Sequence, residues 1–421
     1  MRRNEWALVA FTALTNTADA VTRVALPLLA VGLTDSPALV ALVAVLLTLP
    51  WLLTALHVGV LVDRHNRRTL MVVAELARLA SIAALLTAVT TQSLSLPMVF
   101  AVAAVLGVAE VVAMTAGASI IPAAIELDRR EKANARITAV EYLCHGFVGA
   151  PIGGFLVAAG FVFALGVTGV VYLAGGLLLL ALTGAFKPVR AERRPVRLEI
   201  REGLSFLWHH RLLRTMALLI TVMAGCWAAW MALIPAYAMG PLRLNESQYG
   251  FLLTALGAGG VVGALVVGRV NRLLGPRRAM FADIVGSFLL VAVPALLPAG
   301  PGSAIPIAAA AFAAGLGGTM WVVNARTIYQ SVVPDALQGR FHSASRLVGW
   351  GFTPIAAGLA GVVAQAVSFR AAFAVFAIAC AGLVVPFLRV VTSSALTAGG
   401  ATGAGDRSGG PVEVVGAGTG K

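Results

Sequence analysis

The chain is dominated by long apolar runs, each close to the length that a helix needs to cross a membrane. Runs of about 20 residues or more alternate with short charged or Gly/Pro/Ser-containing segments. A soluble domain carries roughly 25% charged residues, whereas this chain has 12% charged and 59% hydrophobic residues. Such a chain cannot cover its surface with polar groups. The sequence therefore predicts an all-α integral membrane protein.

The apolar runs fall into two sets of six, which predicts twelve transmembrane helices. The first set lies near Trp6–Leu33, Pro37–Val62, Thr69–Thr90, Leu96–Ile121, Ala135–Ala159 and Phe161–Phe186. The second set lies near Leu212–Met239, Ser247–Val267, Ala279–Leu297, Ile305–Val323, Phe341–Gln365 and Phe369–Val391. The predicted domains are an N-terminal half (1–186), a cytoplasmic linker (187–211), a C-terminal half (212–391) and a disordered Gly-rich tail (392–421). The linker is either an amphipathic helix on the membrane surface or a solvated connection.

The basic residues are distributed unevenly along the chain. The net charge is +13, with 31 Lys and Arg against 18 Asp and Glu, and 27 of the 31 lie at the termini, in alternate connections or in the span ends next to them. The opposite connections hold only Arg243 and Arg370. The positive-inside rule then predicts a multi-pass protein of the bacterial inner membrane with both termini in the cytoplasm. The positive charge follows from topology, and no nucleic-acid partner is needed to explain it.

The two sets of helices repeat each other at local level. Three pairs of segments match between equivalent helices: residues 59–68 and 268–278, Ser119–Pro122 and Ser331–Pro334, and Pro151–Gly154 and Pro354–Gly358. Their offsets of 209, 212 and 203 residues are all close to half the chain. This indicates duplication of a six-helix unit, as in transporters whose two repeats surround a central cavity at mid-membrane.

With this repeat and a long middle loop, the chain resembles the major facilitator superfamily over Trp6–Val391. Residues 59–68 are similar to the family signature G-x-L-x-D-R-x-G-R-R, with Asn66 where Gly is usual. We expect the turn to survive this change because Asn tolerates left-handed backbone. We also expect Gly59 to let a neighbouring helix approach closely. The resemblance implies a gating loop made by Gly59, Asp63, Arg64 and Arg68. The alternative is an ordinary basic loop.

A second motif lies on the fifth predicted helix. Residues 146–154, GFVGAPIGG, resemble the antiporter signature G-x-x-x-G-P-x-x-G-G, with Ala replacing one Gly and a spacing one residue tighter. The small residues and Pro of this motif are Gly149, Pro151, Gly153 and Gly154. They indicate either an antiporter or plain helix packing. Within the superfamily, Asp19 and residues 119–134, 201–208 and 333–340 resemble macrolide-efflux pumps and siderophore exporters.

Ionisable residues inside predicted spans are costly and are functional candidates by default. On the first span Thr12, Asn16, Asp19 and Arg23 form one polar stripe at helical spacing. Asp19 and Arg23, one turn apart, either neutralise each other or handle protons or substrate. Glu110 lies at the centre of the fourth span without a partner nearby in sequence.

Glu141 and His145 lie one turn apart near the cytoplasmic end of the fifth span. This spacing would allow them to relay a proton, or to form a structural hydrogen bond. Together with Asp19, Arg23 and Glu110 they are the proton-coupling candidates of the sequence.

The C-terminal half offers aromatic and amide side chains at the centres of its spans. With Asn16 of the first half, Trp227, Trp230 and Asn324 are the substrate-cavity candidates. Trp321 and Trp350 suit either the cavity or the membrane interface. We expect no mid-span acid in this half, so protonation is assigned to the N-terminal half.

The resemblance implies proton-coupled export of small amphipathic molecules such as drugs, antibiotics or other secondary metabolites. A siderophore or lipid-like exporter is the alternative of the same fold, and a membrane sensor or an unrecognised polytopic enzyme is the alternative from another class. The sequence lacks the hydrolase and P-loop motifs that we sought, so we expect no enzymatic activity, cofactor or metal. Cys144, Cys226 and Cys380 fit small buried side chains. The expected partners are substrate, protons and lipid, and the expected state is monomeric.

Overall fold

The computed structural model describes residues 2–141, 143–144, 148–184, 186, 196–334 and 337–392. Over these residues the chain forms helices and no strands. The helices of the first half are α1 (Arg2–Val31), α2 (Pro37–Arg64), α3 (Arg67–Thr90), α4 (Leu96–Ala124), α5 (Leu127–Glu141), α6 (Gly149–Ala158) and α7 (Phe161–Leu180). The remaining helices are α8 (Val196–His209), α9 (Arg211–Met239), α10 (Glu246–Leu274), α11 (Pro276–Leu296), η2 (Pro301–Ser303), α12 (Ala304–Val332), α13 (Gln338–Gly351), α14 (Thr353–Ala366), α15 (Phe369–Ala381) and α16 (Val384–Val390). The predicted disordered tail lies outside the described residues, except for its first position.

Ten segments of the described chain are long and apolar enough to cross a membrane. They comprise α2, α3, α4, α7, α9, α10, α11, η2 with α12, α13 with α14, and α15 with α16. The first predicted span, α1, is 30 residues long but carries charged residues such as Asp19 and Arg23. The fifth predicted span is divided between α5 and α6. Together these elements are consistent with the twelve predicted spans, and the all-α membrane fold is confirmed.

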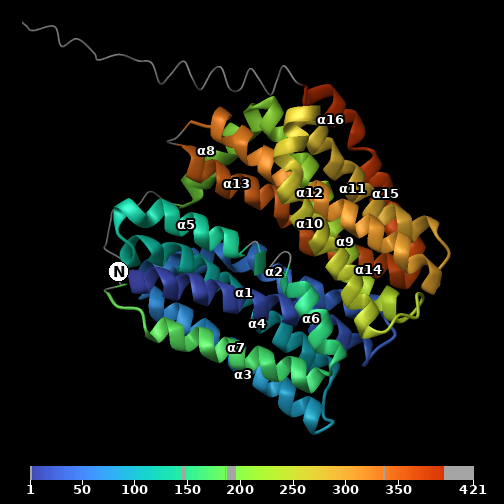
Figure 1. The fold of residues 1–421 in the computed structure, drawn as a ribbon, viewed down its shortest axis with the longest axis horizontal. Coiled ribbons are helices and arrows are strands. Elements are labelled where there is room, and N and C mark those ends of the chain that lie inside the picture. The colour runs from blue at the N-terminus through green and yellow to red at the C-terminus, as the bar shows by residue number, and fades with distance from the viewer. Residues whose placement is uncertain are drawn as a thin grey trace, which may run out of the picture.

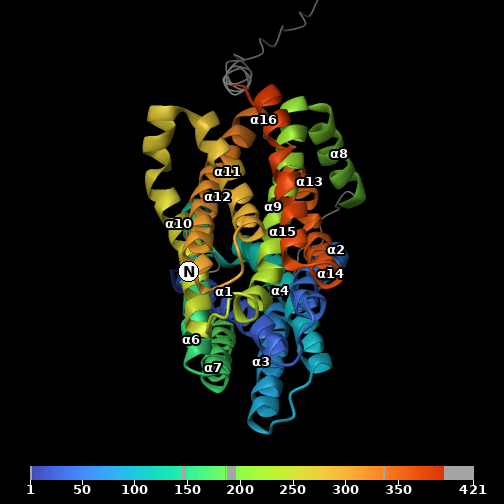
Figure 2. The same ribbon diagram turned by 90° about the vertical axis from the view of Figure 1, so that its right-hand side faces the viewer.

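The helices form two bundles, α1–α7 and α9–α16 (Figures 1 and 2). Side chains cap several helix starts: Ser36 accepts a hydrogen bond from Leu39 N of α2, and Asn245 forms a capping box with Gln248 at α10. Within the C-terminal bundle α12 packs closely on α10 and α11, where glycines such as Gly259 and Gly315 let backbones approach. Small residues therefore set the helix spacing where burial from water cannot drive packing.

The linker helix α8 packs against α13 and α9 rather than standing apart from the bundle. Leu207 is completely buried, and Gly203 lies so close to the Arg340 carbonyl that a side chain there would clash. Glu202 and Arg340 form an ion pair of 2.6 Å across the same contact. The described part of the linker is thus helical, and the C-terminal half holds it through side-chain contacts; its place on the membrane surface stays a prediction. Residues 187–195 lie outside the described part.

The two halves meet mainly through two helix pairs, α2 with α14 and α6 with α10. At the first contact, Gly361 packs on Ala38 and Ala41, and the Ser36 hydroxyl donates to Gln365 Oε1 at 2.7 Å. At the second, Gly154 and Gly250 bring the backbones of α6 and α10 together. Both contacts lie at the end of the molecule away from α8 and from the chain's N-terminus (Figure 1). The halves are thus joined at one end by close backbone packing.

Candidate functional site

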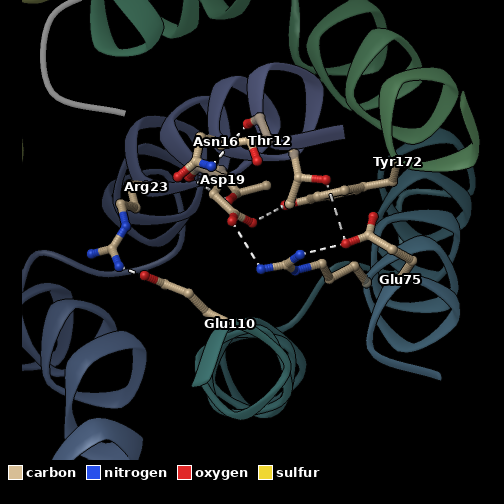
Figure 3. A network of polar contacts seen from close by, with 10 residues as sticks. Thr12, Asn16, Asp19, Arg23, Glu75, Glu110 and Tyr172 are labelled. Atoms are coloured by element: carbon tan, nitrogen blue, oxygen red, sulfur yellow. Dashed lines mark hydrogen bonds and ion pairs between the residues drawn. The ribbon is translucent and has the colours of Figure 1, made fainter. Parts of the chain in front are cut away.

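A network of buried charged side chains lies inside the N-terminal half (Figure 3). Its residues come from four helices and lie between positions 19 and 172 of the sequence. Its members are Asp19 and Arg23 on α1, Glu75 and Arg78 on α3, Glu110 on α4 and Tyr172 on α7. Arg78 is 0% exposed, Glu75 2%, and Asp19 and Glu110 7% each. Charges held this far from water require partners.

Arg78 is the centre of the network. Its Nη2 donates to Asp19 Oδ2 at 2.9 Å, and its Nη1 donates to Glu75 Oε1 at 2.5 Å. The Tyr172 hydroxyl donates to the other Asp19 oxygen at 2.7 Å, and the guanidinium lies 5.6 Å from the Tyr172 ring centroid. Thr15 Oγ1 contacts Glu75 Oε1 at 3.5 Å, whereas Glu75 Oε2 is buried without a hydrogen-bond partner. Two carboxyl groups therefore share one guanidinium.

Arg23 bonds a different acid. Its Nη2 donates to Glu110 Oε2 at 2.6 Å, and its side chain is 29% exposed. Asp19 and Arg23, one turn apart on α1, point to different neighbours, so they do not form the i,i+4 pair that their spacing allows (Figure 3). Asp19 faces α3 and α7, while Arg23 faces α4. The acid that seemed isolated in sequence, Glu110, is thus paired across helices.

The remaining proton-coupling candidates are Glu141 and His145. Glu141 is half-buried at the end of α5, and His145 lies outside the described residues. The structure therefore gives no geometry for the Glu141–His145 relay, and that relay stays a prediction.

The gating-loop residues lie at the end of α2 and the start of α3. Asn66 is not left-handed: its φ is −65°, and its side chain caps α3 by accepting from Arg68 N and Thr69 N. The Arg68 guanidinium donates to Leu180 O at 2.5 Å, within the same half. A side chain at Gly59 would meet no described atom within 4 Å, so the expected close helix approach is not found in this conformation. Asp63 is half-buried and Arg64 exposed.

The motif of small residues on the fifth span has a clear packing role. Gly149 and Gly153 of α6 pack directly against Ala20, Val21 and Val24 of α1. The adjacent Gly154 instead contacts Gly250 of α10, in the other half. Pro151 lies in the first turn of α6. The glycines thus pack α6 on α1 and, through Gly154, on the other half, and the antiporter interpretation stays a prediction.

The substrate-cavity candidates have varied surroundings. Asn16 is half-buried and donates to Thr12 O at 2.8 Å. Trp230 is 0% exposed and its indole N–H has no partner, so a substrate cannot touch it in this conformation. Asn324 is buried and exchanges hydrogen bonds of 2.9 and 3.2 Å with Asn271 of α10, which makes it part of the bundle's packing. Trp227 is half-buried and donates to Ser287 Oγ at 3.1 Å.

Two buried acids inside the predicted spans escaped sequence reasoning. Glu75 sits one turn before Arg78 within an apolar span, a signal that an i,i+3 search for charge pairs would have detected. Asp283 on α11 is 3% exposed. The expectation that the C-terminal half lacks a mid-span acid is therefore wrong. The signal is present in the sequence, because Asp283 is a charged residue within the predicted span 279–297.

The chain matches the Major Facilitator Superfamily over residues 8–352. It is 28% identical over 389 residues to the multidrug efflux pump Tap of Mycolicibacterium fortuitum, covering 88% of this chain and 92% of that protein. It is 30% identical over 388 residues to the multidrug efflux pump Tap of Mycobacterium tuberculosis, with coverages of 87% and 88%. A solved bacterial homologue of the iron transporter ferroportin in an inward-facing state has a similar fold, with a TM-score of 0.69 at 16% identity and coverages of 92% and 98%.

The fold and these similarities define the class of protein as a membrane transporter rather than an enzyme. The chain belongs to the Major Facilitator Superfamily.

Proposed function

We propose that this protein exports small amphipathic molecules, such as drugs, antibiotics or other secondary metabolites, in exchange for protons. Two observations support the proposal. The first is its similarity over most of its length to proteins named multidrug efflux pumps. The second is the buried Asp19–Arg78–Glu75 triad. The proposed location is the bacterial inner membrane, with both termini in the cytoplasm as the distribution of Arg and Lys indicates.

The triad is the observation that carries proton coupling. With all groups ionised, two carboxylates and one guanidinium leave one negative charge in excess, and Arg23 is already bonded to Glu110. In a medium of low dielectric constant an excess charge is costly, and one bound proton removes it. Glu75 Oε2, buried without a partner, is a carboxyl oxygen on which that proton could reside. The triad can therefore alternate between a neutral protonated state and a charged one.

The position of α1 links this site to movement of the two halves. Asp19 lies on α1, which packs on α6 through Gly149 and Gly153 and also contacts α9 of the other half. Gly154 of α6 in turn forms the contact with α10. A change in the Asp19–Arg78 bond therefore acts on a helix that touches the joined end of the halves. Proton binding can thereby favour one of the two alternating conformations.

The proton gradient is large enough for useful export. One charge moved across 100 mV supplies about 2.3 kcal/mol, which corresponds to a substrate gradient of about 40-fold.

The test is transport of rhodamine 6G, a fluorescent amphipathic dye, in proteoliposomes. The wild type should move the dye when a pH gradient is imposed and stop when an uncoupler is added. Asp19→Asn and Glu75→Gln should each lose gradient-driven transport and retain dye exchange, because an amide copies only one protonation state. Both variants should fold, since Arg78 keeps one carboxylate partner. Glu126→Gln, which alters an exposed acid after α4, is the matched control.

Transport that survives in the double variant Asp19→Asn/Glu75→Gln would overturn the role of the triad. Uncoupler-insensitive, ATP-dependent transport would overturn proton coupling itself. Failure to move this dye or related amphipathic probes would favour the siderophore or lipid-like alternative, or a non-transporting sensor.

A further inference from the structure

The C-terminal half contains its own buried acid, in a setting unlike that of the N-terminal triad. Asp283 on α11 is 3% exposed, and its Oδ1 accepts a hydrogen bond of 3.1 Å from the Ser287 hydroxyl. Ser287 is completely buried and accepts a bond of 3.1 Å from the Trp227 indole N–H on α9. The indole of Trp227 thus donates to Ser287, and Ser287 in turn donates to Asp283 Oδ1.

This cluster occupies the place in the repeat that the triad occupies in the first half. Asp283 follows Glu75 by 208 positions, Ser287 follows Arg78 by 209 and Trp227 follows Asp19 by 208. The prolines inside α1 and α9, Pro27 and Pro235, are also 208 positions apart. Duplication therefore placed an acid on the third helix of each half. In the second half the guanidinium is replaced by a hydroxyl and the partner acid by an indole.

Asp283 consequently lacks the cation that its counterpart has. No ion pair to it occurs among the described residues. The titratable groups that face this region from the packed helices are the thiols of Cys226 on α9 and Cys380 on α15, which contact the carbonyls of Phe376 and Ile284. Neither supplies a positive charge. Among the described residues, the Ser287 hydroxyl is the group that donates a hydrogen bond to a carboxylate here.

The packing around Asp283 selects the ligand. A Cβ at Gly317 of α12 would lie 2.6 Å from the Asp283 Cα, and one at Gly318 would lie 3.7 Å from its Oδ1. The α12 backbone therefore lies directly against the acid. One carboxyl and one hydroxyl are also too few oxygen ligands for a metal cation, and no group of metal-ligand residues occurs in the described chain. The ligand that fits this site is a proton.

We propose that Asp283 is an exchangeable proton-binding site of the C-terminal half, so that each half of the transporter carries one proton site. Trp227 connects the hydrogen bonds of this cluster to the interface between the halves. It is half-buried, and its helix α9 contacts α1 and α2 of the other half. Movement of the halves therefore alters the surroundings of the indole that supports Ser287. The role of this site in transport rests on the proposed export function. The existence of the site does not.

Proton release from the purified protein tests the site without transport. In weakly buffered detergent solution, a rise of pH through neutrality should release one proton fewer per molecule from Asp283→Asn than from the wild type, because exposed carboxyl groups have already lost their protons in this range. Asp35→Asn, the same change at an exposed acid between α1 and α2, is the matched control and should release as many protons near neutral pH as the wild type. Equal release from Asp283→Asn and the wild type would overturn the proposal.

A second variant covers the case in which Asp283→Asn fails to fold. Ser287→Ala keeps the acid and removes its hydrogen bond, so it should change the pH at which that one proton is released. An unchanged pH profile in Ser287→Ala would count against the site.

The transport readout separates this inference from the proposed function. In proteoliposomes the proton-to-dye ratio, obtained from the reversal potential, should fall by one in Asp283→Asn. A wild type that ignores the pH gradient would defeat the proposed function, while the proton release would still decide whether Asp283 binds a proton. A proton-driven wild type whose ratio and proton release are unchanged in Asp283→Asn would defeat this inference alone.

Discussion

At the scale of single residues, the network depends on how many acids each guanidinium serves. Arg78 is fully buried and holds two carboxylates, whereas Arg23 is partly exposed and holds one. Removing one partner of a buried ion pair leaves an uncompensated charge, which costs far more than the loss of an exposed pair. The two arginines should therefore respond differently to the same substitution, although both lie within membrane-spanning helices.

We expect Arg78→Gln to lower the stability of the protein by about 3–5 kcal/mol, because Asp19 and Glu75 are left facing each other. Arg23→Gln is the matched control and should have a smaller effect, because Arg23 is partly exposed and holds one carboxylate rather than two. Thermal unfolding in detergent, followed by size-exclusion chromatography, measures both. Adding Asp19→Asn and Glu75→Gln to Arg78→Gln should restore part of the loss. Equal stability of Arg78→Gln and Arg23→Gln would show that Arg78 does not bind the two acids as described.

At the scale of helices, the division of the fifth span gives α6 two separate partners. Its glycines pack on α1 at one side and on α10 at the other, so α6 connects the N-terminal half with the C-terminal half. The beginning of α1 is also tied to α5, where Glu5 bonds Arg129 at 2.5 Å and Arg136 at 2.6 Å. Both α5 and α6 are thus held to α1, and the small residues of α6 determine how closely the halves meet.

We expect Gly154→Ala to weaken the joined end of the molecule and to reduce transport. A Cβ there would collide with Gly250, so α6 and α10 must separate. The matched control is Gly268→Ala on α10, where a Cβ meets no described atom within 4 Å. Because Ala is favoured over Gly in helices by roughly 0.5–1 kcal/mol, the control should be neutral or stabilising. Reactivity of cysteines placed beside Gly154 toward a membrane-impermeant maleimide reports the separation. The same reactivity in both variants would contradict this role.

At the scale of the whole molecule, the two helical bundles are in close contact at one end. In a transporter that works by alternating access, the bundles separate at this end and close at the other. The α2–α14 contact includes an exposed hydrogen bond between Ser36 and Gln365, which belong to opposite halves. Alternating access requires this bond to break once in each cycle. The two side chains therefore report whether the halves separate at this end.

We expect the double variant Ser36→Cys/Gln365→Cys, made with Cys144→Ser, to lose transport on oxidation and to regain it with a reductant. A covalent link between α2 and α14 prevents the halves from separating there. Each single cysteine variant should be insensitive to the oxidant, since Cys226 and Cys380 are buried. Dye transport and the fraction cross-linked would be measured on the same sample. Full transport by completely cross-linked protein would show that this end stays closed throughout the cycle.

The sequence by itself determined the class of fold, because twelve apolar runs with few charges satisfy the membrane only as helices. It also identified Asp19, Arg23 and Glu110 as unusual, since a charge in an apolar run is costly wherever the helix faces. Helical periodicity fixes which residues share one face of one helix. It says nothing of which neighbouring helix that face meets.

The tertiary structure alone decided the partners. Asp19 bonds Arg78, which is 59 positions away, and Arg23 bonds Glu110, which is 87 positions away, although Asp19 and Arg23 are one turn apart. Packing of α1 on α7 and against α4 turned the two side chains toward different neighbours, and burial made each pairing obligatory. In the C-terminal half, packing placed α12 against Asp283, which has no ion-pair partner among the described residues. Residue types and spacing thus predicted that charged side chains are buried. The rotation and contacts of the helices determined which of these side chains form ion pairs with one another.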